Sequence, residues 1–384
     1  MNKSQSMRAK YEHLYLHVPF CARRCSYCDF AIAVRREVPW QHYAASVSRE
    51  CEIRRVADYA APLHTVYLGG GTPSRLGVDG VAATLDTLRQ HFTWHELAEV
   101  TLEANPEDIS VSAVRAWRDA GVNRLSIGIQ SFDDLVLSWM HRVHDASVAR
   151  RAAEAAREGG ISAFSLDLIF ATPDRLARDW EADLTQVVAL APDHVSLYGL
   201  TVEEHTPLGR WHARGQEVEA PEDRYEREFL TAHDLLGAAG YEHYEVSNFS
   251  KAAHRARHNS AYWTGAPYLG LGPSAHGFDG ETRRWNLEAY AAWERAVSSL
   301  TDPIGGEERL TDDNRTAEQV YLGLRTIDGL VVTDPELQRA ARWVDAGWVK
   351  ATSTPDGHRL VCTPAGWMRL DTLAADLTAF RSAS

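Results

Sequence analysis

The sequence predicts an α/β fold, in which a partial (β/α)6 TIM-like barrel is followed by a small winged-helix-like domain. Up to about residue 200, short β-rich runs alternate with longer segments of helical spacing, which is typical of right-handed βαβ units and a parallel sheet. Polar residues gather near the C-terminal ends of several runs. Residues 308–384 combine helical patterns with a hairpin signal.

Six β-rich runs define the predicted strands. They are LYLHVPF (14–20), TVYLGGGTP (65–73), EVTLEANP (99–106), RLSIGIQSF (124–132), FSLDLIFATP (164–173) and HVSLYGL (194–200). Segment 149–158 lies between two runs, is rich in Ala, Arg and Glu, and stops at Gly159–Gly160, which indicates a helix with a glycine C-cap. Six units are fewer than the eight of a full barrel, so an open barrel and a doubly wound sheet both fit.

The distribution of polar residues favours the barrel. They follow the strand runs at 69–72 (GGGT), Glu103, Asn105, Gln130 and Asp167. A doubly wound sheet would concentrate function at one switch point, whereas a barrel carries it at the C-terminal ends of many strands. Several polar groups near one rim also indicate a shared polar ligand.

We expect the chain to divide into four segments. They are a disordered tail at 1–11, the barrel at 12–205, an extension of the barrel at 206–307 and the small C-terminal domain at 308–384. The extension is aromatic, punctuated by Gly and Pro, and poor in long periodic helix. In the last segment, TPDG separates two β-rich runs, and a final helix follows Thr363–Pro364.

The net charge, the apolar runs and the cysteine count argue against several classes of protein. The net charge of −13 argues against loose electrostatic binding to nucleic acid. No apolar run of about 18 residues predicts a membrane span, and the first ten residues lack the apolar core of a signal peptide, so we expect a cytoplasmic protein. Five cysteines in such a chain favour metal or redox chemistry over a disulfide scaffold. A homodimer is compatible with the sequence.

Three cysteines lie close together in HVPFCARRCSYCDF (17–30), with the spacing C-x3-C-x2-C: Cys21, Cys25 and Cys28. A structural zinc site requires four ligands, which His17 or Asp29 could complete. Three thiolates could instead hold an iron–sulfur cluster with one iron open to a small molecule. Reduced cysteines without a metal are the third alternative. The other two, Cys51 and Cys362, are expected to be buried free thiols.

CARRCSYCDF resembles the signature of the radical S-adenosylmethionine (SAM) superfamily. The flanking YLHVPF, GGGTPS, LEANP, RLSIGIQSF and DLIF resemble the branch that contains the oxygen-independent coproporphyrinogen III oxidases (HemN) and the haem chaperones (HemW). The resemblance runs from about residue 12 into the C-terminal domain, and it implies that the predicted barrel is a radical SAM barrel. It also implies a [4Fe–4S] cluster on the three clustered cysteines and SAM chelated to its open iron.

The resemblance further assigns the SAM pocket. It implies that Tyr15 and Tyr27 lie near the cluster and SAM. It assigns Gly70, Gly71 and Thr72 to the methionine end and Glu103 to the amino group, and it expects Gln130, Arg142 and Asp167 to line the remainder. Read from the residues alone, Arg142 could equally be a solvated loop residue. An electron donor would be needed if SAM is cleaved, and no residue is assigned a catalytic role.

Three features separate the chaperones from the oxidases in this branch. The oxidases resemble C-x3-C-x2-C-x-C, but Phe30 occupies the place of the fourth cysteine. The oxidases also carry a longer N-terminal segment, whereas we expect the first strand here to start near residue 14. RHNSAYW (257–263) matches the HNxxYW motif of the chaperones, which implies a haem site at His258, Asn259, Tyr262 and Trp263. His254 and His276 are weaker ligand candidates, and from the residues alone a histidine beside aromatics is usually packed.

The resemblance therefore predicts a carrier that binds haem and delivers it to an acceptor haemoprotein that the sequence does not identify. It leaves open whether the protein is also an enzyme. One alternative is an oxygen-independent coproporphyrinogen III oxidase. The other, from a different class, is a zinc-stabilised interaction protein.

Overall fold

The computed structural model describes residues 11–383 except residues 59 and 356. The predicted tail therefore lies outside the described residues, apart from Tyr11, which already belongs to the first strand.

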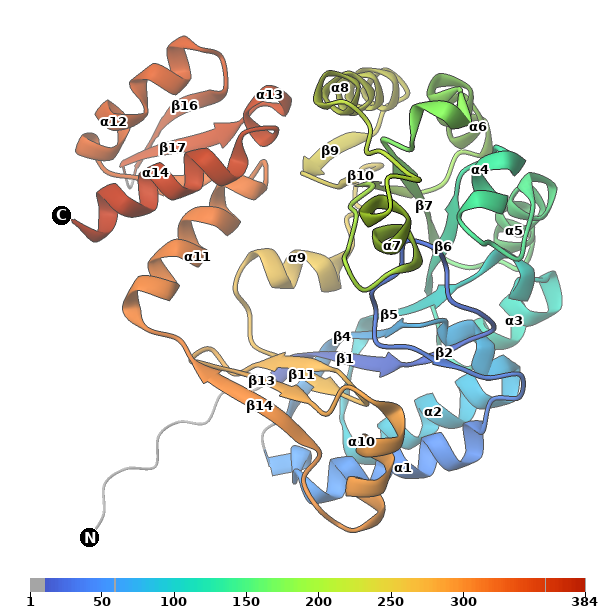
Figure 1. Ribbon diagram of the computed structural model, residues 1–384. Coiled ribbons are helices and arrows are strands. Elements are labelled where there is room, and N and C mark those ends of the chain that lie inside the picture. The colour runs from blue at the N-terminus through green and yellow to red at the C-terminus, as the bar shows by residue number, and fades with distance from the viewer. Residues whose placement is uncertain (1–10, 59, 356, 384) are drawn as a thin grey trace, which may run out of the picture.

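A sheet of twelve described strands forms the centre of the molecule (Figure 1). Its middle contains the six predicted strands, which are parallel and neighbour one another in chain order. They are β1 (Tyr11–Val18), β4 (Ala60–Gly70), β5 (Trp94–Ala104), β6 (Arg124–Gln130), β7 (Ala163–Phe170) and β8 (His194–Gly199). The predicted mixed α/β fold with a large parallel-rich sheet is confirmed.

The segment after β8 extends both edges of the sheet. Beyond β8 it adds the antiparallel strands β10 (Asn248–Ser250) and β9 (Glu242–Glu245). Beyond β1 it adds the parallel strand β11 (Tyr268–Leu271), followed by the antiparallel strands β12 (His276–Phe278), β13 (Thr282–Asn286) and β14 (Ile304–Arg309). The chain passes from one edge to the other through helix α9 (Arg257–Trp263), which packs against β4.

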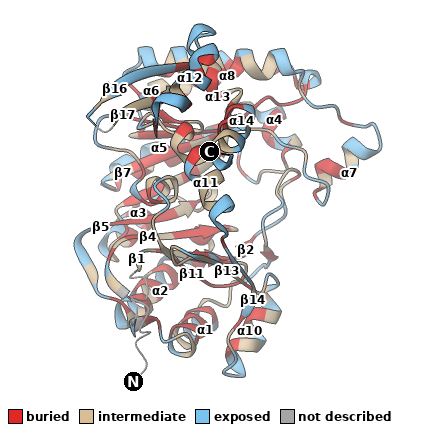
Figure 2. Ribbon diagram, turned by 90° about the vertical axis from the view of Figure 1, so that its left-hand side faces the viewer, coloured by how far each residue is buried: buried red, intermediate tan, exposed pale blue. Residues whose placement is uncertain are grey.

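Helices between the parallel strands cover the outer face of the sheet, and burial is concentrated in the strands (Figure 2). They are α1 (Trp40–Ile53), α2 (Gly77–His91), α3 (Val111–Asp119), α4 (Asp134–Trp139), α5 (Ala146–Glu158) and α6 (Trp180–Leu190). Helix α5 is the one that the sequence marked. Asp145 caps its first turn, and its buried face consists of alanines.

The expectation that the extension lacks long helices is wrong. Helix α8 spans Glu222–Ala238 and packs against β7. Its buried residues include Phe229, Ala232 and Leu236, whose spacing places them on one helix face. The helical period was thus present in the sequence, and the Gly- and Pro-rich stretches around it obscured it. The extension also contains α7 (Pro207–Ala213) and α10 (Tyr290–Ser298).

A small antiparallel sheet is present near the C-terminus, in the order β15-β17-β16. The elements of this region are α11 (Asp312–Arg325), β15 (Leu330–Val332), α12 (Asp334–Asp345), β16 (Val349–Thr354), β17 (Gly357–Cys362), α13 (Pro364–Trp367) and α14 (Leu370–Ser382). The predicted hairpin is the β16–β17 pair. Cys51 and Cys362 are buried free thiols, as predicted. No described helix is long and apolar enough to cross a membrane.

Candidate functional site

The clustered cysteines lie at the C-terminal end of β1. Cys21 belongs to the short strand β2 (Phe20–Cys21), which pairs with β3 (Ala33–Val34), and the loop between these strands carries Cys25 and Cys28. The backbone N–H of Ser26 donates a hydrogen bond of 3.1 Å to the carbonyl oxygen of Met140, at the C-terminal end of α4. This bond holds the cysteine loop at the rim of the sheet. All three cysteines line one cavity of about 440 Å³, hereafter the thiol cavity.

The environment of the three thiols suits a polynuclear centre. Burial raises the pKa of Cys28 to about 11 and also raises that of Cys21, with Cys25 adding to both shifts. Thiolates at this site therefore need positive charge close by, which iron ions would supply. Among the described residues, no three His, Cys, Asp or Glu side chains converge on a single metal ion. Three thiols that line one cavity match the ligand number of an iron–sulfur cluster with one open iron.

The glycine turn after β4 brings that strand against the cysteine loop. Gly70 has φ +116°, and a Cβ there would lie 2.6 Å from the His17 ring. A Cβ on Gly71 would lie 2.6 Å from the Pro19 carbonyl oxygen and 3.0 Å from the Cys21 Sγ atom. Only glycine fits this approach. Thr72, next in the chain, has its Oγ1 atom 3.4 Å from the same sulfur.

Glu103 reaches the same cavity from β5. Burial raises its pKa to about 7, although its carboxylate accepts hydrogen bonds from the Tyr67 hydroxyl at 2.8 Å and from the Gly70 N–H at 3.0 Å. Asp167 adds to the rise. A carboxyl group whose burial opposes ionisation gains most from a cationic partner, and an ammonium group in the cavity would provide one.

Arg142 is not a solvated loop residue. It follows α4, and its guanidinium donates to Asn105 Oδ1 at 2.7 Å and to the Gly128 carbonyl at 2.8 Å. It also lies 3.5 Å from the Cys25 Sγ atom. Arg142 therefore joins β5, β6 and the cysteine loop, and it brings a fixed positive charge to the cavity. No sequence signal marked Asn105 as its partner.

Gln130 ends β6 in a left-handed backbone conformation, with φ +61°. Its Oε1 atom is buried without a hydrogen-bond partner, and the residue lines the thiol cavity. A buried unpartnered amide oxygen is costly, which fits a ligand donor at this point. Asp167 differs, because its carboxylate accepts from Ser126 at 2.6 Å and Ser165 at 2.8 Å; burial raises its pKa and these serines oppose the rise.

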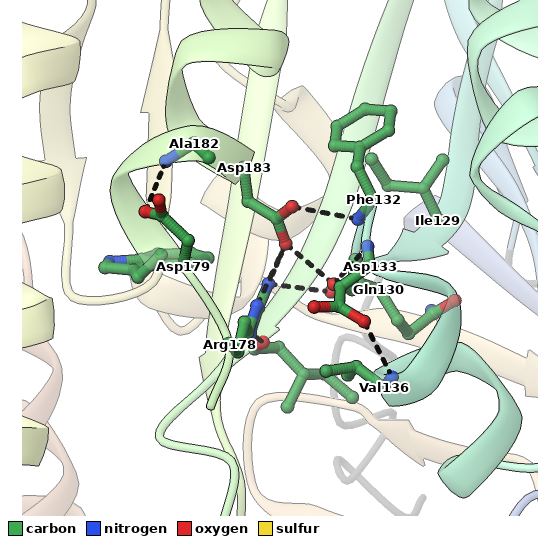
Figure 3. A network of polar contacts seen from close by, with 12 residues as sticks. Ile129, Gln130, Phe132, Asp133, Val136, Arg178, Asp179, Ala182 and Asp183 are labelled. Carbon is green, nitrogen blue, oxygen red and sulfur yellow. Dashed lines mark hydrogen bonds and ion pairs between the residues drawn. The ribbon is translucent and has the colours of Figure 1, made fainter. Parts of the chain in front are cut away.

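A buried ion pair holds the backbone around Gln130 (Figure 3). Arg178 Nη2 lies 2.6 Å from Asp183 Oδ2, and both side chains are at least 97% excluded from solvent, with exposures of 0% and 3%. Asp183 also accepts from the Ser131 hydroxyl at 2.7 Å and the Phe132 N–H at 3.1 Å. Arg178 donates to the Gln130 carbonyl at 3.3 Å. Sequence reasoning missed this pair, which no motif marks.

Most predicted SAM residues meet at the thiol cavity. Those that line it with the cysteines are Tyr27, Gly70, Gly71, Thr72, Glu103, Gln130, Arg142 and Asp167. Tyr15 lies instead in a neighbouring cavity of about 380 Å³, hereafter the second cavity. The two cavities share Asp29, Phe30, Gly70 and Glu103 as a common wall.

The predicted haem residues are dispersed. His258, Asn259 and Trp263 line neither cavity, whereas Tyr262 lines the second cavity. His258 is 1% exposed, and its Nδ1 and Nε2 atoms lie 2.6 Å from the Thr65 hydroxyl and 2.8 Å from the Tyr262 hydroxyl. Burial lowers its pKa to about 3, so the ring is neutral. The guanidinium carbon of Arg325 lies 4.1 Å from the centroid of the Trp263 ring, in a cation–π contact.

Comparisons with known proteins bear on this arrangement. Residues 15–187 match the model of the family described as the Radical SAM superfamily. The chain is 37% identical over 370 residues to a protein of Mycobacterium tuberculosis named "Heme chaperone HemW", which covers 95% of this chain and 94% of that protein. A protein of the same name from Bacillus subtilis is 33% identical and covers 82% of this chain and 84% of its own length.

Among solved structures, coproporphyrinogen III oxidase (HemN) from Escherichia coli has the same fold. It superposes with a TM-score of 0.79 over 97% of this chain and 91% of the oxidase, at 21% sequence identity.

Proposed function

Because the chain belongs to the HemW family of the radical SAM superfamily, we propose that it is a haem chaperone, which binds haem and transfers it to an acceptor haemoprotein. The observation that carries the proposal is the 37% identity over nearly the whole length of both chains to a protein named as such a chaperone. The likeness to the oxidase concerns the fold alone. Phe30, at the place of the oxidase's fourth cysteine, is 61% exposed on the common wall of the two cavities.

In this proposal, Cys21, Cys25 and Cys28 hold a [4Fe–4S] cluster, and SAM occupies the thiol cavity. The bound cluster would supply the electron needed to cleave SAM, taken from an external donor. Glu103 would accept a hydrogen bond from the amino group of SAM. Arg142 would pair with its carboxylate while remaining fixed by Asn105. The unpartnered Oε1 atom of Gln130 would accept from SAM in the same cavity.

The domain organisation is part of the proposal. We assign 12–205 to a partial (β/α)6 radical SAM barrel, 206–307 to its extension and 308–384 to a winged-helix-like unit that serves packing or partner binding. We expect the protein to act in the cytoplasm.

The test is haem transfer by anaerobically reconstituted protein. Wild-type protein loaded with one haem should pass it to an apo-haemoprotein, followed by the absorbance of the acceptor. A parallel assay with coproporphyrinogen III, SAM and a reductant should yield no protoporphyrinogen. Absence of saturable haem binding would refute the carrier function, and decarboxylated product would instead support the oxidase. Zinc in place of iron would support the interaction protein.

A further inference from the structure

The motif histidine is poorly placed to bind a haem iron. Both ring nitrogens of His258 are engaged, by Thr65 on β4 and by Tyr262 one helical turn away. The ring also stacks on Tyr67 with centroids 5.0 Å apart. Iron coordination requires a nitrogen lone pair that faces an open space. His258 would have to break a buried hydrogen bond and leave its packed position to meet this requirement.

The second cavity offers two other imidazoles. His17 is 6% exposed, and its ring nitrogens lie 3.1 Å from the Tyr15 hydroxyl and 2.9 Å from the Ala31 carbonyl oxygen. His276, on β12, is exposed, and no side-chain hydrogen bond engages its ring in the described part of the chain. Trp285 of β13 stacks on the His276 ring, with the two ring centroids 5.8 Å apart.

Aromatic side chains form part of the wall of the second cavity, beside the carboxyl groups of Asp29, Glu103 and Glu288. Tyr262 and Tyr268 line it, with ring centroids 4.6 Å apart, and the exposed Phe30 stands at its border with the thiol cavity. Burial raises the pKa of Tyr268, so its phenol stays neutral and is a weak iron ligand at neutral pH. Burial lowers the pKa of His276, which keeps the imidazole neutral and its lone pair available.

We propose that the haem iron is coordinated by His276 in the second cavity and that His258 positions Tyr262 on the wall of that cavity. This inference rests on the proposed haem-carrier function and names its iron ligand. A volume of about 380 Å³ lies in the range of small-molecule sites, and it accommodates part of a porphyrin while the rest remains exposed. An exposed edge suits a haem that must be handed on. The common wall at Glu103 and Gly70 would make haem and SAM direct neighbours.

The test compares three single variants with the wild type in anaerobic haem titrations. They are His276→Gly, His258→Gln and the control His254→Ala, which removes a histidine that lines neither cavity. Absorbance reports affinity, and resonance Raman spectra of the ferrous protein report the iron–histidine stretch. His276→Gly should lose that stretch and weaken haem binding at least tenfold. Added imidazole should restore the ligation, which a merely structural loss would not allow.

His258→Gln should keep the iron–histidine stretch, with affinity reduced no more than a few fold, and His254→Ala should match the wild type. Loss of the stretch in His258→Gln but not in His276→Gly would overturn the assignment and leave the carrier function intact. Retention of the stretch in both variants would also overturn it. If the wild type binds no haem, the proposed function itself fails.

Discussion

Removal of the buried arginine beneath Gln130 is expected to destabilise the protein strongly. In Arg178→Met, Asp183 would keep its hydrogen bonds from Ser131 and Phe132 but lose its cation in a site where it is 3% exposed. An uncompensated buried charge of this kind typically costs about 3–5 kcal/mol. We therefore expect a loss of about 3–5 kcal/mol at pH 7.

A surface pair provides the matched control. Arg339 and Asp376 lie at the same 2.6 Å N···O distance, but the arginine is 43% exposed and Arg342 also contacts the carboxylate at 2.8 Å. Arg339→Met should cost less than about 1 kcal/mol. Urea unfolding of reduced protein, followed by tryptophan fluorescence, measures both free energies of unfolding. Trp180 lies under the Arg178 guanidinium at 4.6 Å and reports locally.

The site beside the ion pair supplies a second readout. SAM binding should also weaken, since Arg178 supports the Gln130 carbonyl. A deficit below about 1 kcal/mol, or one equal to that of Arg339→Met, would refute the reasoning.

Three further predictions concern the site. Gly71→Ala places a Cβ 2.6 Å from a backbone oxygen, so it should cost about 1–3 kcal/mol of stability and lower the iron content after reconstitution. The control Gly237→Ala, which has open space around it, should keep the wild-type iron content. Equal iron contents in the two variants would contradict this prediction. SAM affinity should fall up to tenfold per pH unit below about pH 7, because Glu103 becomes protonated there. Glu103→Gln should bind SAM more weakly and without this pH dependence. Isothermal titration calorimetry at pH 6–8 measures both affinities, and parallel pH profiles would show that Glu103 does not bind SAM. The pKa of His258 is about 3 in the folded state and about 6.5 in the unfolded state, so the folded state binds fewer protons and stability falls as the pH drops below 6.5. In urea unfolding, the wild type should lose about 2 kcal/mol more than His258→Gln between pH 7 and pH 5. Equal losses would show that the ring is not buried in its neutral form.

The sequence by itself determined the order of the strands and the position of the cysteine cluster. Both features depend on local sequence. A strand or helix period and the spacing of Cys21, Cys25 and Cys28 can each be recognised within a short segment of the chain. The sequence also indicated the glycine turn after β4, but it did not show why glycine is required there. The structure shows that Gly71 is required by the approach of Pro19 and Cys21.

Only the tertiary structure decided which polar groups are already engaged. Thr65 lies 193 residues from His258 in the chain, yet its hydroxyl occupies one ring nitrogen. The second cavity likewise exists because β11 pairs with β1, which brings Tyr268 and His276 beside residues from the start of the chain. A motif records which side chains are available, whereas hydrogen bonds and burial between distant segments determine which of them keeps a free lone pair. For this reason HNSAYW indicated His258, and the folded chain leaves His276 open.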